Sequence, residues 1–215
     1  PGGAGWVDRA WGQKRRFGAS PHDGMHNRAM NTPIALPSAE QVIDETRHWM
    51  LQAVIGLNLC PFAKAVHVKN QIRYVVSEAT TPEELAHDLI EELQFLNQAD
   101  PQEVDTTLLI HPQTLNDFLD YNDFLDVADA AVTELDLEGI LQVASFHPQF
   151  QFEDTEPDDI DNFTNRSPYP TLHLLREDSI EKAVQAFPEA SDIFEANIET
   201  LEKLGHDGWQ QLMKR

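Results

Sequence analysis

Three histidines lie at or near the ends of predicted β-strands, where an imidazole is well placed for catalysis or metal binding. His111 and His147 each occupy the last position of a predicted strand and each precedes a proline, which lacks a backbone N–H and ends the ladder. His173 lies near the start of the following strand. If that strand runs antiparallel to its predecessor, all three side chains meet at one edge of the sheet, where α/β folds bind ligands. His147, His173 and His111 are therefore the candidate catalytic residues.

Side-chain alternation along the strands supports this convergence. It predicts that each histidine shares a face of the sheet with the residue two positions before it: His111 with Leu109, His147 with Ser145, and His173 with Thr171. It also predicts that Leu172 and Leu174 lie on the opposite face.

Three imidazoles near a carboxylate can bind zinc or iron, because both metals use such sets with an open position for substrate. The candidate ligands are His111, His147, His173 and Asp154, with Glu153 as the other nearby carboxylate. Two alternatives remain open. One is a metal-free active site that combines histidine with arginine, and the other is a structural role in capping the sheet edge.

Positive charge is scarce around these histidines. Between Tyr74 and Glu181 there is no lysine, and the only arginines are Arg166 and Arg176. Arginine binds carboxylates and phosphates through paired hydrogen bonds, so we expect an anionic small-molecule substrate. Its candidate binding residues are Arg166, Asn165, Tyr169, Ser167 and Arg176. A structural salt bridge is the alternative that we prefer for Arg176. The segment 149–170 would cover the site.

The pattern of apolar residues predicts alternating helices and strands. Ser38 and Gln41 form a capping box that starts a first helix, and Thr81 with Pro82 starts a second. The predicted strands are 71–79, 106–112, 140–148 and 171–177, and further helices cover 116–135, 179–187 and 193–204, the last ending at Gly205. The tandem NDFLD-Y-NDFLD within 116–135 has a period of six, which does not match 3.6 and marks a candidate kink.

This order predicts an α/β fold, with α+β as a variant, built on a mixed, largely parallel four-stranded sheet flanked by helices. A thioredoxin-like βαβαββα order is an alternative topology. The long segment 149–170 replaces the tight hairpin of that fold, and its CxxC motif is absent from the sequence.

The chain divides into a leader, residues 1–29, and a single α/β domain, residues 30–215. The leader holds six of the ten glycines and shows no periodicity, so we expect it to be disordered and outside the fold. It carries five Lys/Arg against two acids, which leaves the rest with a net charge of −25. Such a body repels phosphate backbones, so nucleic acid is excluded as a partner.

Other features favour a cytoplasmic protein. No apolar run reaches the roughly 18 residues of a membrane span. The single cysteine, Cys60, excludes an internal disulfide, and we expect it to be packed as a small hydrophobe rather than to act as a nucleophile. Glu45 with His48 and Glu84 with His87 have the E-x-x-H spacing of di-iron bundles, but a solvated helix face is the simpler interpretation.

Five segments carry a family resemblance: GLNLCPFAK, TTLLIHP, NDFLD, QVASFHPQFQF and NRSPYPTLHLLRE. With them the chain, from about Glu45 to Trp209, resembles a bacterial family catalogued as a domain of unknown function, number 1415. The resemblance implies a cytoplasmic bacterial protein with the leader outside the family body, and it implies no activity.

The residues lead to two functional hypotheses. The first is a small-molecule enzyme, a hydrolase or an oxidoreductase, with a histidine-rich and metal-dependent or metal-free site and an arginine that orients an anionic substrate. The second is a non-catalytic protein-binding or assembly module, in which SPYP and the acidic segment form a rigid surface. Convergence of the three imidazoles around a pocket would favour the enzyme. The oligomeric state is not determined by the sequence.

Overall fold

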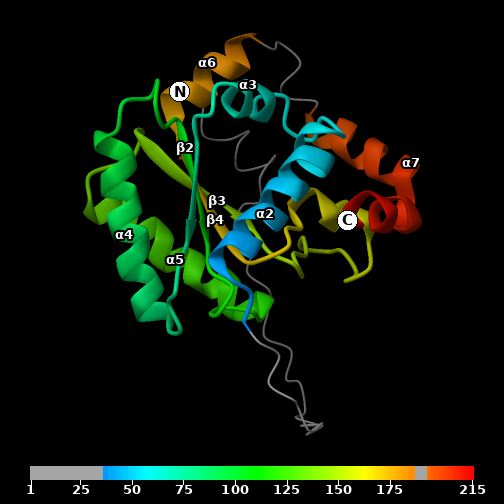
Figure 1. Ribbon diagram of the computed structural model, residues 1–215, viewed down its shortest axis with the longest axis horizontal. Helices are drawn as coiled ribbons and strands as arrows, with labels where there is room; N and C mark the ends of the chain where they lie inside the picture. Colours follow the sequence, from blue (N-terminus) through cyan, green and yellow to red (C-terminus); the bar gives the residue numbers. More distant parts are fainter. Residues whose placement is uncertain (1–35, 187–192) are drawn as a thin grey trace, which may run out of the picture.

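A four-stranded sheet lies between two layers of helices in the computed structural model, which describes residues 36–186 and 193–215 (Figure 1). The strands are β1 (Ile72–Val76), β2 (Thr106–Ile110), β3 (Leu141–Phe146) and β4 (Thr171–Arg176). Their order across the sheet is β1-β2-β4-β3. The predicted leader, residues 1–29, falls outside the described residues.

The last strand, β4, determines the topology. β1 and β2 pair in parallel, whereas β4 lies between β2 and β3 and runs antiparallel to both. The predicted mixed sheet flanked by helices is therefore confirmed, and the direction of β4, which the sequence left open, is antiparallel to both neighbours. The sheet was predicted to be largely parallel, but two of its three strand pairings are antiparallel. The reason is that β4 lies between β2 and β3, which the sequence suggested as neighbours.

Helices cover both faces of the sheet. One face packs against α4 (Pro82–Gln98) and α5 (Phe118–Glu134), and its core includes Leu89, Leu109 and Leu172. The other packs against α2 (Ala39–Trp49), the wider turn η1 (Met50–Ile55) and α7 (Ile193–Met213), around Trp49, Leu108 and Phe146. Two separate apolar clusters thus share the sheet as their common wall.

Side-chain caps begin α2 and α4 at the predicted positions. The Ser38 hydroxyl accepts a hydrogen bond from the Gln41 N–H at 3.2 Å, and the Thr81 hydroxyl accepts one from the Glu84 N–H at 3.3 Å. Asp117 caps α5 through the N–H of Leu119 at 2.8 Å. These bonds satisfy donors that the first turn of a helix leaves unpaired.

The predicted kink in the tandem NDFLD-Y-NDFLD is wrong, because α5 is continuous from Phe118 to Glu134. Phe118, Tyr121 and Phe124 are spaced three residues apart and all three are buried. The repeat therefore presents aromatic rings on one face of an ordinary helix. Its acidic residues lie between them, toward solvent.

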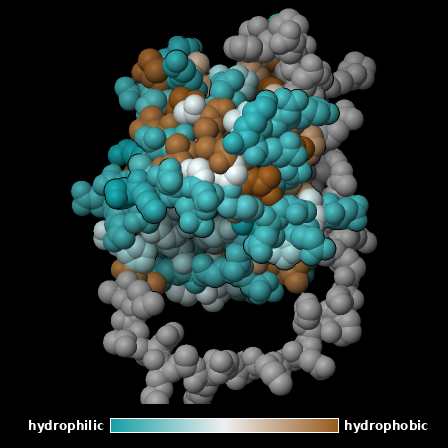
Figure 2. All heavy atoms as spheres, turned by 90° about the vertical axis from the view of Figure 1, so that its right-hand side faces the viewer, coloured by the Kyte–Doolittle hydropathy of each residue, from teal (hydrophilic) through white to brown (hydrophobic). Residues whose placement is uncertain are grey.

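The remaining differences lie in short segments. Two short elements were not predicted, α3 (Ala63–Val68) and the 3₁₀ turn η2 (Ile160–Asn165), while α6 runs over Glu177–Ala186. Gly205 interrupts α7 with φ 64°, as predicted, but the chain then resumes a helical course to Met213. No helix in residues 36–186 and 193–215 is both long and apolar enough to span a membrane. On the side that carries α7, hydrophilic residues surround a group of hydrophobic ones (Figure 2).

Arg176 ties the sheet to the end of α4. Its buried guanidinium donates from Nη2 to the carbonyls of Leu96 at 2.5 Å, Ala99 at 2.8 Å and Val104 at 3.3 Å. Helix ends leave such carbonyls unpaired, and a cation there also interacts favourably with the helix dipole. These carbonyl contacts give Arg176 a structural role, and the salt bridge expected for it stays a prediction.

We predict that Arg176→Met lowers the free energy of unfolding by about 2–4 kcal/mol, because it leaves buried carbonyls without a donor. Urea denaturation measures this change. Arg47→Met is the matched control, since Arg47 is exposed and stacks over the Tyr74 ring at 5.0 Å, a contact worth about 1 kcal/mol or less. Equal losses in the two variants would show that the Arg176 bonds contribute little.

Candidate functional site

Two of the three candidate histidines meet at the predicted edge of the sheet. His111 and His147 directly follow β2 and β3, and both rings pack on Tyr121 of α5, with centroid distances of 5.7 and 5.0 Å. The Tyr121 hydroxyl donates to the Thr171 carbonyl at 2.9 Å and accepts from the Phe146 N–H at 3.1 Å. Tyr121 therefore joins both rings to the end of the sheet.

His147 uses both of its ring nitrogens within the fold. Nδ1 accepts the Gln149 N–H at 3.0 Å, so Nε2 carries the hydrogen and donates to the Leu115 carbonyl at 3.1 Å. The residue has no exposed surface. A metal or a substrate could reach His147 only by breaking one of these bonds.

His111 keeps one free lone pair. A carbonyl can only accept, so Nδ1 carries the hydrogen and donates to the Thr114 carbonyl at 3.1 Å. Nε2 is then unprotonated and has no hydrogen-bond partner, although the residue is completely buried. His111 has the electronic form of a base but no surface through which a substrate would approach.

The predicted convergence is wrong for His173. Its neighbours across the sheet are Leu108 and Ala144, and its ring packs 6.0 Å from Phe146, on the face covered by α2 and α7. Leu172 and Leu174 point to the α4–α5 face instead, with Leu109. The antiparallel register of β4 therefore reverses the predicted parity, and the Nε2 of His173 donates to the Thr106 hydroxyl at 2.7 Å.

Desolvation keeps all three histidines neutral. Burial lowers the pKa of His111 to about 4, and the neighbouring His147 adds to this effect. Burial also lowers the pKa of His147 and of His173 to about 4. Near pH 7 these rings are therefore uncharged and act as polar parts of the core.

The predicted zinc or iron ligands do not come together. His147 has no free nitrogen, while the unprotonated nitrogens of His111 and His173 lie on opposite faces of the sheet. In residues 36–186 and 193–215, one group of three possible metal ligands has its ligand atoms within 4.8 Å of one another. It consists of His87, Asp88 and Glu91 and does not include the predicted carboxylate Asp154. The donor set in the sheet does not fit either metal.

The candidate substrate arginine fastens the long acidic loop. Arg166 donates from Nε to the Phe150 carbonyl at 3.2 Å and from Nη2 to the Pro157 carbonyl at 2.5 Å, and it stacks on the Phe163 ring at 4.2 Å. The neighbouring Asn165 amide donates to the Ser145 carbonyl at 3.1 Å. These contacts hold the loop against the end of β3.

The SPYP segment is fastened in the same way. The Ser167 hydroxyl donates to the Tyr169 carbonyl at 2.6 Å, and the Tyr169 hydroxyl donates to a Glu45 carboxylate oxygen at 2.6 Å. This bond lowers the pKa of Glu45, while burial and the carboxylate raise the pKa of Tyr169 to about 12. The predicted substrate residues thus connect the loop to α2 and to the sheet.

Cys60 is an unreactive thiol. Burial raises the pKa of its thiol to about 11, so the thiol is protonated near neutral pH. A protonated thiol is a poor nucleophile. The expectation that Cys60 packs as a small hydrophobe agrees with its place in the apolar cluster around Trp49.

A groove opens elsewhere, between the carboxyl end of β1 and the face of α4 that contacts β1. It has a volume of about 480 Å³. Its walls contain five carboxylates and no lysine or arginine: Glu78, Glu84, Asp88, Glu91 and Glu92. We call this feature the acidic groove.

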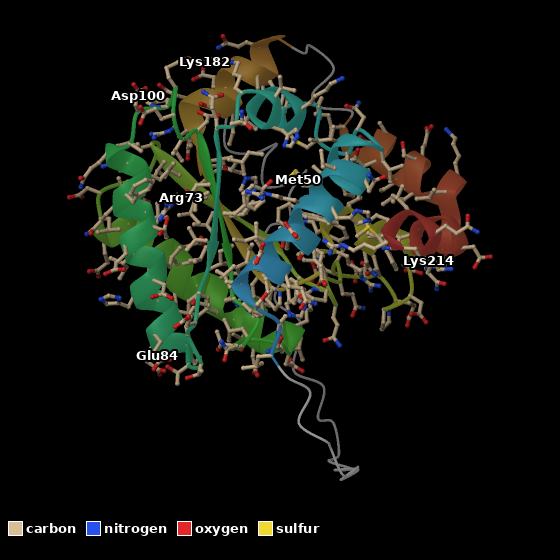
Figure 3. The ribbon with its side chains drawn as sticks, in the orientation of Figure 1. Met50, Arg73, Glu84, Asp100, Lys182 and Lys214 are labelled. Carbon is tan, nitrogen blue, oxygen red and sulfur yellow. The ribbon has the colours of Figure 1, made fainter. Side chains whose placement is uncertain are left out.

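Two polar contacts join β1 to the wall of the acidic groove. Arg73 holds Glu92 through a pair of hydrogen bonds of 2.8 and 2.9 Å, and the Ser77 hydroxyl donates to Asp88 at 2.5 Å. In Figure 3, Arg73 lies between β1 and α4, and Glu84 lies at the amino end of the helix. Glu78 and Glu91 are exposed on the rim.

The acidic groove was not predicted, although the spacing of its carboxylates is visible in the sequence. Glu84, Asp88 and Glu91 are spaced four and three residues apart, which places them on one face of a helix. They follow β1, which ends at Val76 and is continued by Ser77 and Glu78. Of these three residues only Glu84 belongs to the E-x-x-H spacing, with His87, which was interpreted as a solvated helix face.

We predict that acid weakens the fold through the buried histidines. Their folded pKa of about 4 lies below the ordinary value of 6.5, so protons bind the unfolded chain first. The stabilisation is complete above pH 6.5 and is lost as the pH falls toward about 4. At pH 5 the loss is on the order of 2 kcal/mol for each histidine. Urea denaturation at pH 7.5 and pH 5 measures it.

His111→Phe keeps a ring against Tyr121 but removes one titrating group. We expect it to reduce the difference in unfolding free energy between the two pH values by roughly a third, since three histidines share this pKa shift. An unchanged difference would show that His111 takes up its proton in the folded state.

Comparison with known proteins gives one result that identifies the family. A family model described as "Protein of unknown function (DUF1415)" matches residues 41–211. The searches of curated proteins and of solved structures returned no match. The match covers most of the sequence and both layers of helices, and the chain therefore belongs to the DUF1415 family.

Proposed function

We propose that this domain is a non-catalytic binding module for a basic segment of a partner protein. The observation that carries the proposal is the acidic groove, whose walls hold five carboxylates and no cationic side chain. A concave surface lined by one sign of charge concentrates its field and attracts oppositely charged groups. A lysine-rich or arginine-rich segment is the partner that this field selects.

The charge of the surrounding layer strengthens the field. α4 contains five acidic residues and α5 contains another five, and neither helix has a lysine or an arginine. Arg166 and Arg176 are the only cationic residues between Tyr74 and Glu181 apart from histidine, and both direct donors to backbone carbonyls inside the fold. Neither of these arginines neutralises the negative charge of this layer, in which Arg73 pairs with Glu92.

The enzyme hypothesis has weaker support. It requires His111, His147 and His173 to converge, but His173 lies on the opposite face and His147 has no free nitrogen. What remains for it is the unprotonated Nε2 of His111, which is buried and reaches no solvent. Catalysis there would require an opening beside Tyr121.

The proposal also includes the setting of the protein. An acidic body repels phosphate backbones, which supports a protein partner rather than a nucleic acid. The cytoplasmic location expected from a single cysteine stays part of the proposal, and so does the bacterial origin implied by the resemblance.

We predict that an acetylated oligolysine peptide binds the full chain and that Glu78→Gln combined with Glu91→Gln weakens binding about threefold to tenfold, because each exposed charge pair contributes up to about 1 kcal/mol. Both side chains are exposed on the rim of the acidic groove. Fluorescence anisotropy at low and at physiological ionic strength measures the affinity, which should fall as salt increases.

Glu195→Gln combined with Glu202→Gln is the matched control. Both residues are exposed on α7, which packs on the opposite side of the sheet, and the change in net charge is the same. We expect this variant to bind within about twofold of the parent. If both double variants lose affinity equally, the peptide responds to net charge alone and the proposed groove is wrong.

A further inference from the structure

We infer that the basic partner segment binds as an extended strand added to the free edge of β1. This inference rests on the proposed function and specifies how the segment is held. The acidic groove and the edge of β1 are parts of one surface, since Val75, Val76 and Ser77 line the groove. Strand addition is a common way for a sheet to bind a peptide, with backbone bonds giving affinity and side chains giving specificity.

β1 is an edge strand that the protein leaves partly open. It pairs with β2 on one side and has no strand partner on the other within the described part of the chain. All five of its residues are only partly buried, whereas all five residues of β2 are buried. Figure 1 shows β1 between α4 and α2, with neither helix lying across it.

The outward backbone groups of β1 follow from its hydrogen bonds to β2. The Gln71 carbonyl accepts from the Thr106 N–H, and the Ser77 N–H donates to the Ile110 carbonyl at 2.8 Å. Since backbone groups alternate along a strand, the N–H and C=O of Ile72, Tyr74 and Val76 point away from β2. Within residues 36–186 and 193–215 no hydrogen bond to these groups is present. They form a ready row of donors and acceptors.

Side-chain alternation gives the pattern of the partner. Arg73 and Ser77 contact Glu92 and Asp88 of α4, so this face of an added strand would meet the acidic groove. The opposite face of β1 carries Tyr74, over which a guanidinium already stacks. A partner with lysine or arginine at every second position and apolar residues between them therefore fits both sides.

A second copy of this chain is excluded as the occupant by charge. Residues 30–215 carry a net charge of −25, and pairing two β1 edges would bring two acidic grooves together. Like charges across a strand pair are destabilising, and natural proteins use charged edges to prevent such pairing. The acidic groove thus repels self-association and admits a basic strand.

Hydrogen exchange on the full chain tests this mode of binding. The probe is an acetylated peptide in which lysine and valine alternate. We expect it to slow exchange of the Ile72, Tyr74 and Val76 amides at least about tenfold, because their N–H groups become hydrogen-bonded. The amides of Arg73 and Val75 already face β2 and should change little. Nuclear magnetic resonance resolves the individual amides.

N-methylated peptides supply the matched controls. In an added strand, alternate N–H groups face β1 and the others face solvent. Methylation of one alternate set should abolish amide protection and lower affinity at least about tenfold, whereas methylation of the other set should leave both nearly unchanged. A peptide of the same composition with its lysines clustered should bind more weakly.

The outcomes separate this inference from the proposed function. Binding that depends on Glu78 and Glu91 but protects none of the three outward amides would overturn strand addition and leave the acidic groove as the binding site. Absence of such binding would overturn both. Protection of these amides in the free chain would also overturn the inference, since a segment of the chain itself would then hold the edge.

Discussion

The pairing of β4 with both β2 and β3 is the constraint on which the other features depend. By lying between them, β4 makes β2 an interior strand, leaves β1 at the edge and reverses the face on which His173 lies. The same pairing brings Arg176 under the end of α4, where its guanidinium satisfies the last carbonyls. It also places Thr171 where its carbonyl accepts the hydroxyl of Tyr121. The separation of the histidines and the exposure of the β1 edge thus have one cause.

Local sequence signals predicted most of the elements. The capping residues Ser38 and Thr81 begin helices where expected, because a cap acts within one turn of the chain. The position of β4 could not be predicted in the same way, since register between distant strands depends on which faces pack together. The kink predicted for the tandem repeat in α5 is wrong. A period of six residues differs from the 3.6 residues of a helical turn, but the aromatic rings within it are three residues apart, which keeps them on one face of the helix.

The candidate site shows the same division. The sequence pointed to His147 and Arg166 as residues able to do chemistry. In the structure both form hydrogen bonds to the backbone of the acidic loop, at Gln149 and Phe150. Arginine and histidine side chains in such a loop can donate hydrogen bonds to a substrate or to backbone carbonyls. The residue type alone does not show which of the two they bind. The acidic groove depends on Ser77 and Asp88 lying side by side, which requires knowing that α4 packs back along β1. Only its charge was visible beforehand.

The late position of β4 in the chain also affects how the protein folds during synthesis. Ile110 and Thr171, the partners closest in sequence between β2 and β4, are 61 residues apart. While a ribosome adds those residues, β1 and β2 can already pair. The edge of β2 that later pairs with β4 is still free, and the leucines on both faces of β2 are not yet covered by β4 and β3. Closing so long a loop is slow, and an apolar strand exposed in the interval is prone to aggregate. The carboxylates of α4 precede β2 in the chain and those of α5 are synthesised during this interval, and their mutual repulsion between chains keeps the unfinished sheet from associating with another.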